Sequence, residues 1–132
     1  VLIATEQLVA AVHAGWRGVA NGLATAVVAE LKRRGAARPR AWLGPAIGAD
    51  HYPVGPEVHE ALTARGVPTD VWQVGTCVDL RAVLRTELDE IGCRVEMAGG
   101  CTACDLRAAS YRRDGASSGR QWSMVLRTAP VS

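Results

Sequence analysis

The chain has 132 residues, which is the usual size of one domain with a single hydrophobic core. It is 48% hydrophobic and 21% charged, a composition that excludes an intrinsically disordered chain. The formal net charge of +2 is too small to indicate a protein that binds nucleic acid or a membrane surface. No apolar run reaches the roughly 20 residues that a membrane-spanning helix needs.

Cysteine usage predicts a reduced, cytoplasmic protein. Secreted disulfide scaffolds are shorter and richer in cysteine, and no charged segment typical of a signal peptide precedes the first apolar residues. The pair Cys101 and Cys104 forms a lone CxxC motif, whereas a zinc ribbon needs a second pair and a thioredoxin-like site lies at a helix start. We therefore expect two small loop cysteines there. The four cysteines are Cys77, Cys93, Cys101 and Cys104.

Apolar patterns predict the elements of the first third of the chain. Val1–Ala4 resembles the middle of a strand, and Leu8–Val12 is apolar without alternation, as in a strand buried on both faces. Apolar residues at every fourth position from Val19 to Leu31 predict a helix that Gly35 ends. Ala41–Leu43 predicts a short strand that enters a loop rich in glycine and proline.

The middle of the chain predicts two more helices. Pro56 and Gly66 bracket a short helix over Glu57–Arg65. Val71–Val74 is consistent with a strand. Leucines spaced by four predict a helix over Leu80–Ile91, with Asp79 as its N-cap and Gly92 as its terminator.

Two further strands are expected near the end. Arg94–Ala98 is one, and Gln121–Arg127 is the other, with Trp122, Met124 and Leu126 on one face. Strands that alternate with helices predict an α+β fold of α/β layers, in which about three helices cover a mixed β-sheet.

The first candidate site is the junction after the strand that ends at Val12. His13 follows this strand and precedes a glycine turn, and ligand sites of such sheets lie where strands end. Neutral imidazole is a common metal ligand and general base. One histidine cannot complete a zinc site, and a hydrogen-bonded structural histidine is the alternative.

Arg17 occupies the first turn of the expected helix, where a cation is unfavourable by about 0.3–1 kcal/mol. A ligand anion such as phosphate would explain an arginine there. Stacking on Trp16 or pairing with a carboxylate would explain it equally well.

A second candidate is the stretch Ser110–Gly115, which ends in a turn and is followed by Gly119-Arg120. Arg112 and Arg113 could hold an anion or pair with surface carboxylates.

The third candidate is Gly44–Gly48 and the loop that follows it. Its glycines and prolines suit either a binding loop or a structural turn. We expect His51 and His59 in this region to be exposed or structural.

Together these stretches resemble the YfiH family, also called the laccase-domain, multicopper polyphenol oxidase or peptidoglycan editing factor family. Order and spacing agree along nearly the whole chain. The matching segments are His13–Gly18, Leu43–Gly48, Tyr52–Val58, Val78–Leu80, Cys101-Thr102, Ser110–Gly115 and Gly119-Arg120.

The resemblance implies a cytoplasmic enzyme that phosphorolyses purine nucleosides to base and ribose-1-phosphate and deaminates adenosine, with zinc in its site. Purine nucleoside and inorganic phosphate would be its partners, without nucleic acid or membrane; the oligomeric state stays open. Copper-dependent oxidation of phenols is an alternative, although multicopper sites need many histidines and this chain has three. The implied residues are Arg17 and one of Arg112 or Arg113 for phosphate and catalysis, His13 for zinc, and Gly15, Trp16, Gly44 and Tyr111 for substrate.

Two departures from the family pattern qualify this expectation. Family members hold the metal with two histidines and a cysteine, and only His13 matches. We therefore expect residues 1–132 to be a single YfiH-like sandwich domain that lacks its N-terminal part, binds zinc weakly and turns over slowly unless a missing segment or another chain supplies the other ligands. A catalytically incomplete fragment or binding module is the alternative.

The second departure is Ala108-Ala109, where the family usually has aromatic residues. Replacing buried aromatic residues by alanine typically costs ~3–5 kcal/mol. This implies a compensating neighbour or a weaker fold.

Overall fold

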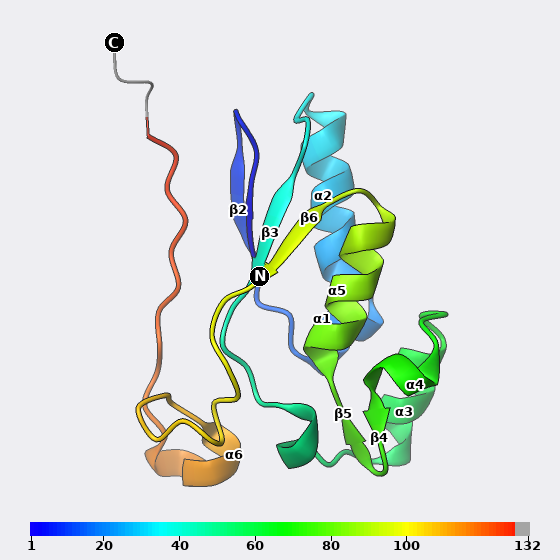
Figure 1. Ribbon diagram of the computed structural model, residues 1–132, viewed down its shortest axis with the longest axis vertical. Coiled ribbons are helices and arrows are strands. Elements are labelled where there is room, and N and C mark those ends of the chain that lie inside the picture. The colour runs from blue at the N-terminus through cyan, green and yellow to red at the C-terminus, as the bar shows by residue number, and fades with distance from the viewer. Residues whose placement is uncertain (129–132) are drawn as a thin grey trace.

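A computed structural model describes residues 1–128, and its centre is a four-stranded mixed sheet (Figure 1). The strand order is β2-β1-β3-β6. β1 runs antiparallel to both neighbours, whereas β3 and β6 are parallel. β2, β3 and β6 therefore point the same way, and their carboxyl ends share one edge. The strands are β1 Leu2–Ala4, β2 Val9–Ala11, β3 Arg40–Leu43 and β6 Arg94–Met97.

β1 and β2 form a hairpin whose turn is held by Thr5. Its Oγ1 accepts the N–H of Leu8 at 2.9 Å and donates to the Leu8 carbonyl at 2.9 Å. The expectation that Leu8–Val12 is buried on both faces was wrong, because β2 is an edge strand with Val9 37% exposed. One face of β2 packs on the core and the other lies outside it, although both faces carry apolar residues.

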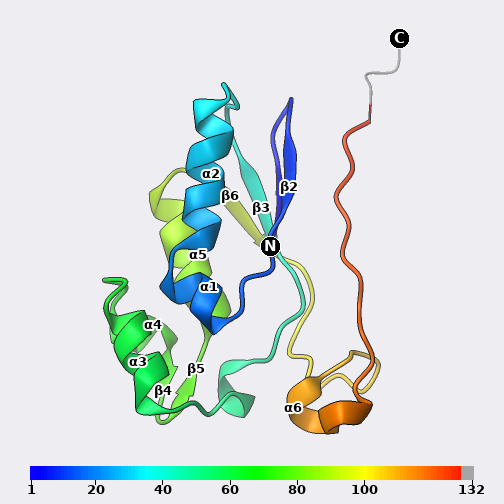
Figure 2. The ribbon, with the colours of Figure 1, turned by 180° about the vertical axis from the view of Figure 1, so that it is seen from behind.

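Two 11-residue helices, α2 Leu23–Arg33 and α5 Leu80–Glu90, lie together on one side of the sheet (Figures 1 and 2). The expected helix from Val19 is interrupted, because Gly22 adopts φ 65° and separates α2 from α1 Trp16–Ala20. Asp79 caps α5 as predicted, its Oδ1 accepting two backbone N–H groups at 2.9 and 3.0 Å. Within residues 1–128, no helix is long and apolar enough to cross a bilayer.

Two shorter helices pack against α1 and α5. α3 spans Pro56–Thr63, close to its predicted range, and α4 spans Thr69–Trp72. The strand predicted over Val71–Val74 was therefore half wrong: β4 is only Gln73–Val74, paired with β5 Cys77–Val78. Trp72 is 1% exposed and its Nε1 donates to the Val67 carbonyl at 3.1 Å, a contact that needs a turn rather than an extended chain.

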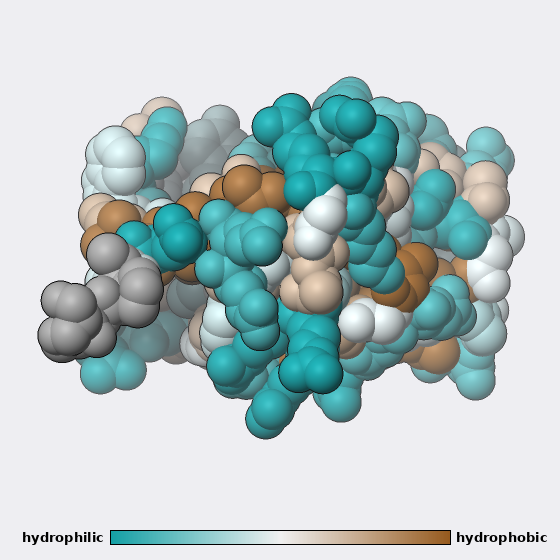
Figure 3. Space-filling view, turned by 90° about the horizontal axis from the view of Figure 1, so that it is seen from above, coloured by the Kyte–Doolittle hydropathy of each residue, from teal (hydrophilic) through white to brown (hydrophobic). Residues whose placement is uncertain are grey.

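The carboxyl end of α2 carries the cations that suit a helix C-terminus. Arg33 and Arg34 each lie 2.7 Å from a carboxylate oxygen of Glu30. Seen from above, this end of the molecule is covered mainly by hydrophilic side chains (Figure 3).

After β6 the chain forms turns, the short helix α6 Tyr111–Asp114 and a long extended segment (Figure 1). The strand predicted over Gln121–Arg127 was wrong, because this segment has no ladder partner within the described residues. Trp122 is 94% exposed, so its alternation marks no buried face. The remaining short elements are the 3-10 turns η1 Ala49–His51 and η2 Gly115–Ser117. The α+β class with a mixed sheet was confirmed.

Candidate functional site

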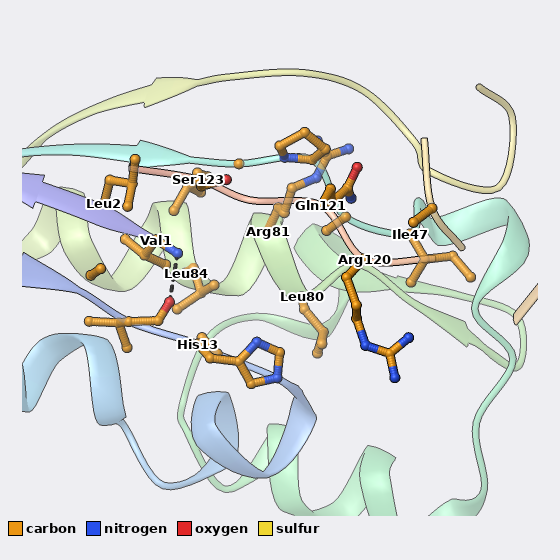
Figure 4. A pocket seen from close by; sticks show the side chains of 18 of the residues that line it. Val1, Leu2, His13, Ile47, Leu80, Arg81, Leu84, Arg120, Gln121 and Ser123 are labelled. Atoms are coloured by element: carbon orange, nitrogen blue, oxygen red, sulfur yellow. Dashed lines mark hydrogen bonds between the residues drawn. The ribbon is translucent and has the colours of Figure 1, made fainter. Parts of the chain in front are cut away.

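A cavity of about 810 Å³ opens at the sheet edge where β2 and β3 end (Figure 4). This volume lies within the range of about 300–1,000 Å³ that small-molecule sites occupy. His13 and Gly44 reach the cavity because each follows the carboxyl end of one of these strands. The segment after α6 closes the opposite side through Ser118–Gln121 and Ser123.

The lining combines apolar walls with one histidine and two cations, Arg120 and Arg81. Leu43, Ile47 and Leu80 contribute apolar surface. His13 and Arg120 project into the same space from segments far apart in the sequence (Figure 4). Arg120 Nη1 donates to the carbonyls of Ser118 and Gly119, at 3.1 and 3.0 Å. Such a site suits a planar ligand together with an anion.

The second cation, Arg81, is held from the other side. Its Nη1 donates to the Gly99 carbonyl at 3.0 Å, so the start of α5 is tied to the turn after β6. Sequence reasoning gave neither Arg81 nor Arg120 a role. Arg120 lies within a family stretch that could have suggested it, whereas nothing in the sequence singles out Arg81.

Of the residues predicted to bind substrate or metal, His13, Gly44 and Tyr111 line the cavity. Gly15 lies beside it, since a Cβ added there would be 3.6 Å from His13 Nε2. Trp16 begins α1 and is half-buried. Their roles toward a substrate stay predictions.

Arg17 and Arg112 are both exposed and stacked on aromatic rings. The Arg17 guanidinium lies 4.3 Å from the ring centre of Trp16, which is the stacking alternative considered for this residue. Arg112 lies 4.7 Å from the ring centre of Tyr52 and donates to the Pro53 carbonyl at 3.0 Å. Neither is among the cavity-lining residues, and their phosphate role stays a prediction.

Arg113 is bound to the protein itself. Its guanidinium donates to the carbonyls of Thr102 at 2.8 Å, Asp105 at 3.0 Å and Ala108 at 2.8 Å. It also pairs with Asp114 at 2.7 Å, which holds the pKa of that carboxyl below its usual value. A phosphate role for Arg113 stays a prediction, while its observed contacts order the loop before α6.

The zinc expected at His13 finds no complete set of three ligands among residues 1–128. His13 belongs to no group of three histidine, cysteine or carboxylate side chains whose ligand atoms converge. The described residues therefore do not fit a complete zinc site in the cavity.

A group of this kind exists elsewhere, at His51, Cys101 and Cys104. The two sulfurs each lie 3.7 Å from His51 Nδ1. The cysteines do occupy a loop, as expected, but the sequence offered no sign that His51, 50 residues earlier, joins them. His59 instead contacts the Thr76 carbonyl at 3.2 Å.

Cys101 has the lower pKa of the two thiols in this group. Burial raises the pKa of Cys101, but hydrogen bonds from the backbone N–H groups of Gly48, Cys104 and Ala103 outweigh burial and bring the pKa to about 7. The pKa of Cys104 is raised, chiefly by its hydrogen bond with Cys101. One thiolate is therefore favoured over two in the metal-free protein.

Ala109 also lines the cavity. The compensating neighbour or weaker fold expected from Ala108-Ala109 stays a prediction.

Comparison with known families places these features in context. Residues 1–128 match the family model described as multi-copper polyphenol oxidoreductase laccase. The chain is 35% identical to adenosine deaminase RL5 from an unknown prokaryotic organism, over 91% of this chain and 50% of that protein. It is 40% identical to a purine nucleoside phosphorylase of Xylella fastidiosa, over 78% and 43%. It is 36% identical to purine nucleoside phosphorylase YfiH of Escherichia coli, over 89% and 50%.

A solved structure is similar throughout the same region. The crystal structure of Neisseria meningitidis protein NMB0706 superposes with a TM-score of 0.76 at 34% sequence identity, covering 87% of this chain and 51% of that one. The chain thus spans about half the length of the curated relatives it matches.

Proposed function

The chain belongs to the multi-copper polyphenol oxidoreductase laccase family, and from this premise we propose that its cavity binds a purine nucleoside and inorganic phosphate for phosphorolysis. Relatives at 35–40% identity are named as purine nucleoside phosphorylases and an adenosine deaminase. The observation that carries the proposal is that the three candidate stretches of the sequence meet in one cavity. They contribute His13 and Ala14, Leu43–Ile47, and Tyr111 with Gly119 and Arg120.

The lining supports this substrate pair chemically. A purine ring needs apolar surface, which Leu43, Ile47 and Leu80 offer. Phosphate needs cations with several N–H donors, and Arg120 presents a guanidinium to the same space. Arg17 and Arg112 stay candidate phosphate ligands that would have to leave their aromatic partners.

In the proposed reaction, a phosphate oxygen attacks the anomeric carbon of the nucleoside. The bond from this carbon to the base nitrogen breaks, its electron pair stays with the base, and the base takes up a proton. Arg120 would position the phosphate and offset its charge, which lowers the barrier by orientation and electrostatic stabilisation. His13 lies where it could hydrogen-bond the sugar or the phosphate.

Deamination of adenosine is the second activity that the relatives' names suggest. It would need an activated water, and His13 is the single histidine among the cavity-lining residues. Copper-dependent phenol oxidation finds no support in a cavity with one histidine.

The test is to incubate the chain with adenosine, with and without phosphate, and to separate adenine, inosine and hypoxanthine by chromatography. We expect adenine only when phosphate is present. Arg120→Ala should raise the phosphate concentration for half-maximal rate by about 10–100-fold, since a charged hydrogen bond contributes ~1.5–3 kcal/mol. Arg17→Ala tests the sequence prediction in the same assay.

Arg127→Ala is the matched control, because Arg127 donates to the Glu6 carbonyl at 3.1 Å and lies outside the cavity lining. A chain that melts cooperatively, yet neither releases adenine nor binds adenosine by calorimetry, would establish the alternative of an incomplete fragment. Equal loss in Arg120→Ala and Arg127→Ala would remove Arg120 from the site.

A further inference from the structure

We infer that His51, Cys101 and Cys104 bind one zinc ion, at a site separate from His13 and independent of the proposed phosphorolysis. Their ligand atoms all lie within 4.8 Å of one another. Cys101 is half-buried, while His51 and Cys104 are exposed, so an ion can enter from solvent.

The distances fit a tetrahedral zinc ion. With Zn–S of about 2.3 Å and Zn–N of about 2.0–2.1 Å, tetrahedral geometry separates sulfur from nitrogen by about 3.6 Å. The distance from His51 Nδ1 is 3.7 Å to Cys101 Sγ and 3.7 Å to Cys104 Sγ. Both sulfur–nitrogen distances therefore match those around a tetrahedral ion bound to His51 Nδ1.

The two loops that supply the ligands are already joined by the backbone. Ala46 and Cys101 form a parallel bridge, and the Thr102 N–H donates to the Ala46 carbonyl at 3.0 Å. The Gly48 N–H donates to Cys101 Sγ at 3.1 Å. This bond positions the sulfur before any metal arrives.

The turn between the cysteines is held by Arg113, which acts as a positioning residue. Its guanidinium donates hydrogen bonds to the carbonyls of Thr102 and Ala103, at 2.8 and 3.4 Å, and to that of Asp105 at 3.0 Å. The contacts fix the backbone on both sides of Cys104. A turn fixed in this way loses little conformational freedom when it binds an ion.

The ligand types select the metal. Two thiolates and an imidazole are soft to borderline donors and suit zinc, whereas calcium and magnesium require oxygen ligands. Three protein ligands leave the fourth tetrahedral position for water or an added group. Because the loop at Ala46 also lines the cavity, the ion would fasten one cavity wall to the turn after β6.

The experiment is a cobalt(II) titration of the full chain, reduced by a phosphine, followed by displacement with zinc. Thiolate ligation gives a charge-transfer band in the near ultraviolet, and we expect it to saturate at one equivalent. Cys104→Ser and His51→Asn should abolish stoichiometric binding. The controls Cys77→Ser and His13→Asn, which leave the three ligands intact, should bind as the parent does.

Thermal melting with a chelator present checks that each variant is folded. Cys104 and His51 are exposed, so their variants are expected to fold even if Cys101→Ser does not. Binding that survives Cys104→Ser, or that disappears in His13→Asn instead, would overturn the site. So would a folded, reduced chain that gives no charge-transfer band.

Discussion

Residues 1–97 are held in their fold mainly by the burial of apolar side chains, whereas residues 98–128 are held mainly by polar contacts. The first region contains the four-stranded sheet, the helices α2 and α5, and every buried hydrophobic residue of the core among residues 1–128. Ile3, Val28 and Leu88, for example, are each 0% exposed. The second region contributes exposed apolar side chains instead, with Leu106 82% and Trp122 94% exposed. Its order comes from polar contacts, above all those of Arg113.

The core that stabilises the fold therefore lies in the first region, whereas the candidate sites take residues from both regions. The cavity takes His13 and Gly44 from the first region and Arg120 from the second. The cysteine and histidine group likewise joins His51 to Cys101 and Cys104. A change in the second region should therefore alter a site without unfolding the molecule, whereas a change in the core should do the reverse.

The largest expected effect is on the core. Leu88→Ala should lower the free energy of unfolding by ~2–5 kcal/mol, because it leaves a cavity in a fully buried place on α5. Leu106→Ala, the same substitution in the second region, should change it by less than about 0.5 kcal/mol. Chemical denaturation of both variants measures this. Similar losses would show that the second region is also packed by burial.

The next effect is expected at Arg113. Arg113→Lys removes the guanidinium from several carbonyls at once and should weaken cobalt or zinc binding by about 10–100-fold, as loss of support around metal ligands typically does. Its unfolding free energy should fall less than that of Leu88→Ala.

Arg112→Lys is the control for Arg113→Lys, because Arg112 is exposed and contacts Tyr52 and Pro53. Metal titration and denaturation are run on both. Equal metal affinity in the two variants would contradict the positioning role.

The same division explains what the sequence could predict. Where apolar residues pack on a neighbouring element, as in α5 with its Asp79 cap, periodicity and capping rules place the element correctly. Smaller errors in the predicted elements come from the backbone conformation of single residues. Gly22, with φ 65°, interrupts the predicted helix in this way. The alternation in Gln121–Arg127 failed because a strand is defined by its partner, and sequence alone names no partner.

The candidate sites show the same limit. His13 was predicted because strands place residues that follow them at a sheet edge, a rule that needs no long-range contact. Gly44 was predicted from its loop, rich in glycine and proline, and from the family resemblance. His51 could not be joined to Cys101 because a bridge between Ala46 and Cys101, 55 residues apart, brings them together. The contacts of Arg113 with nearby carbonyls likewise depend on the loop path.

A smaller effect is expected from Gly48→Ala. A Cβ there would lie 3.2 Å from both Cβ and Sγ of Cys101, so the sulfur must shift by a few tenths of an ångström. Crowding of this kind costs about 1 kcal/mol at its lower end, and metal affinity should fall by roughly tenfold or less. Gly44→Ala is the control, since its Cβ meets only Ser123 Oγ at 3.8 Å. Unchanged cobalt affinity in Gly48→Ala would show that Cys101 does not need its observed position.

The last comparison needs no substitution. It takes one cysteine from each region, and the pKa values of these two cysteines are shifted in opposite directions. Burial raises the pKa of Cys93 in the first region, while backbone N–H donors bring the pKa of Cys101 in the second to about 7. A thiolate is the reactive form, so in the chelator-treated, folded protein iodoacetamide should modify Cys101 with a rate that rises through a midpoint near pH 7. Cys93 should stay unmodified until the protein unfolds, since its side chain is also buried. Mass spectrometry of peptides at each pH separates the two. A midpoint for Cys101 near the ordinary thiol value of 9.0 would mean that the backbone N–H groups of Gly48, Cys104 and Ala103 do not stabilise the thiolate.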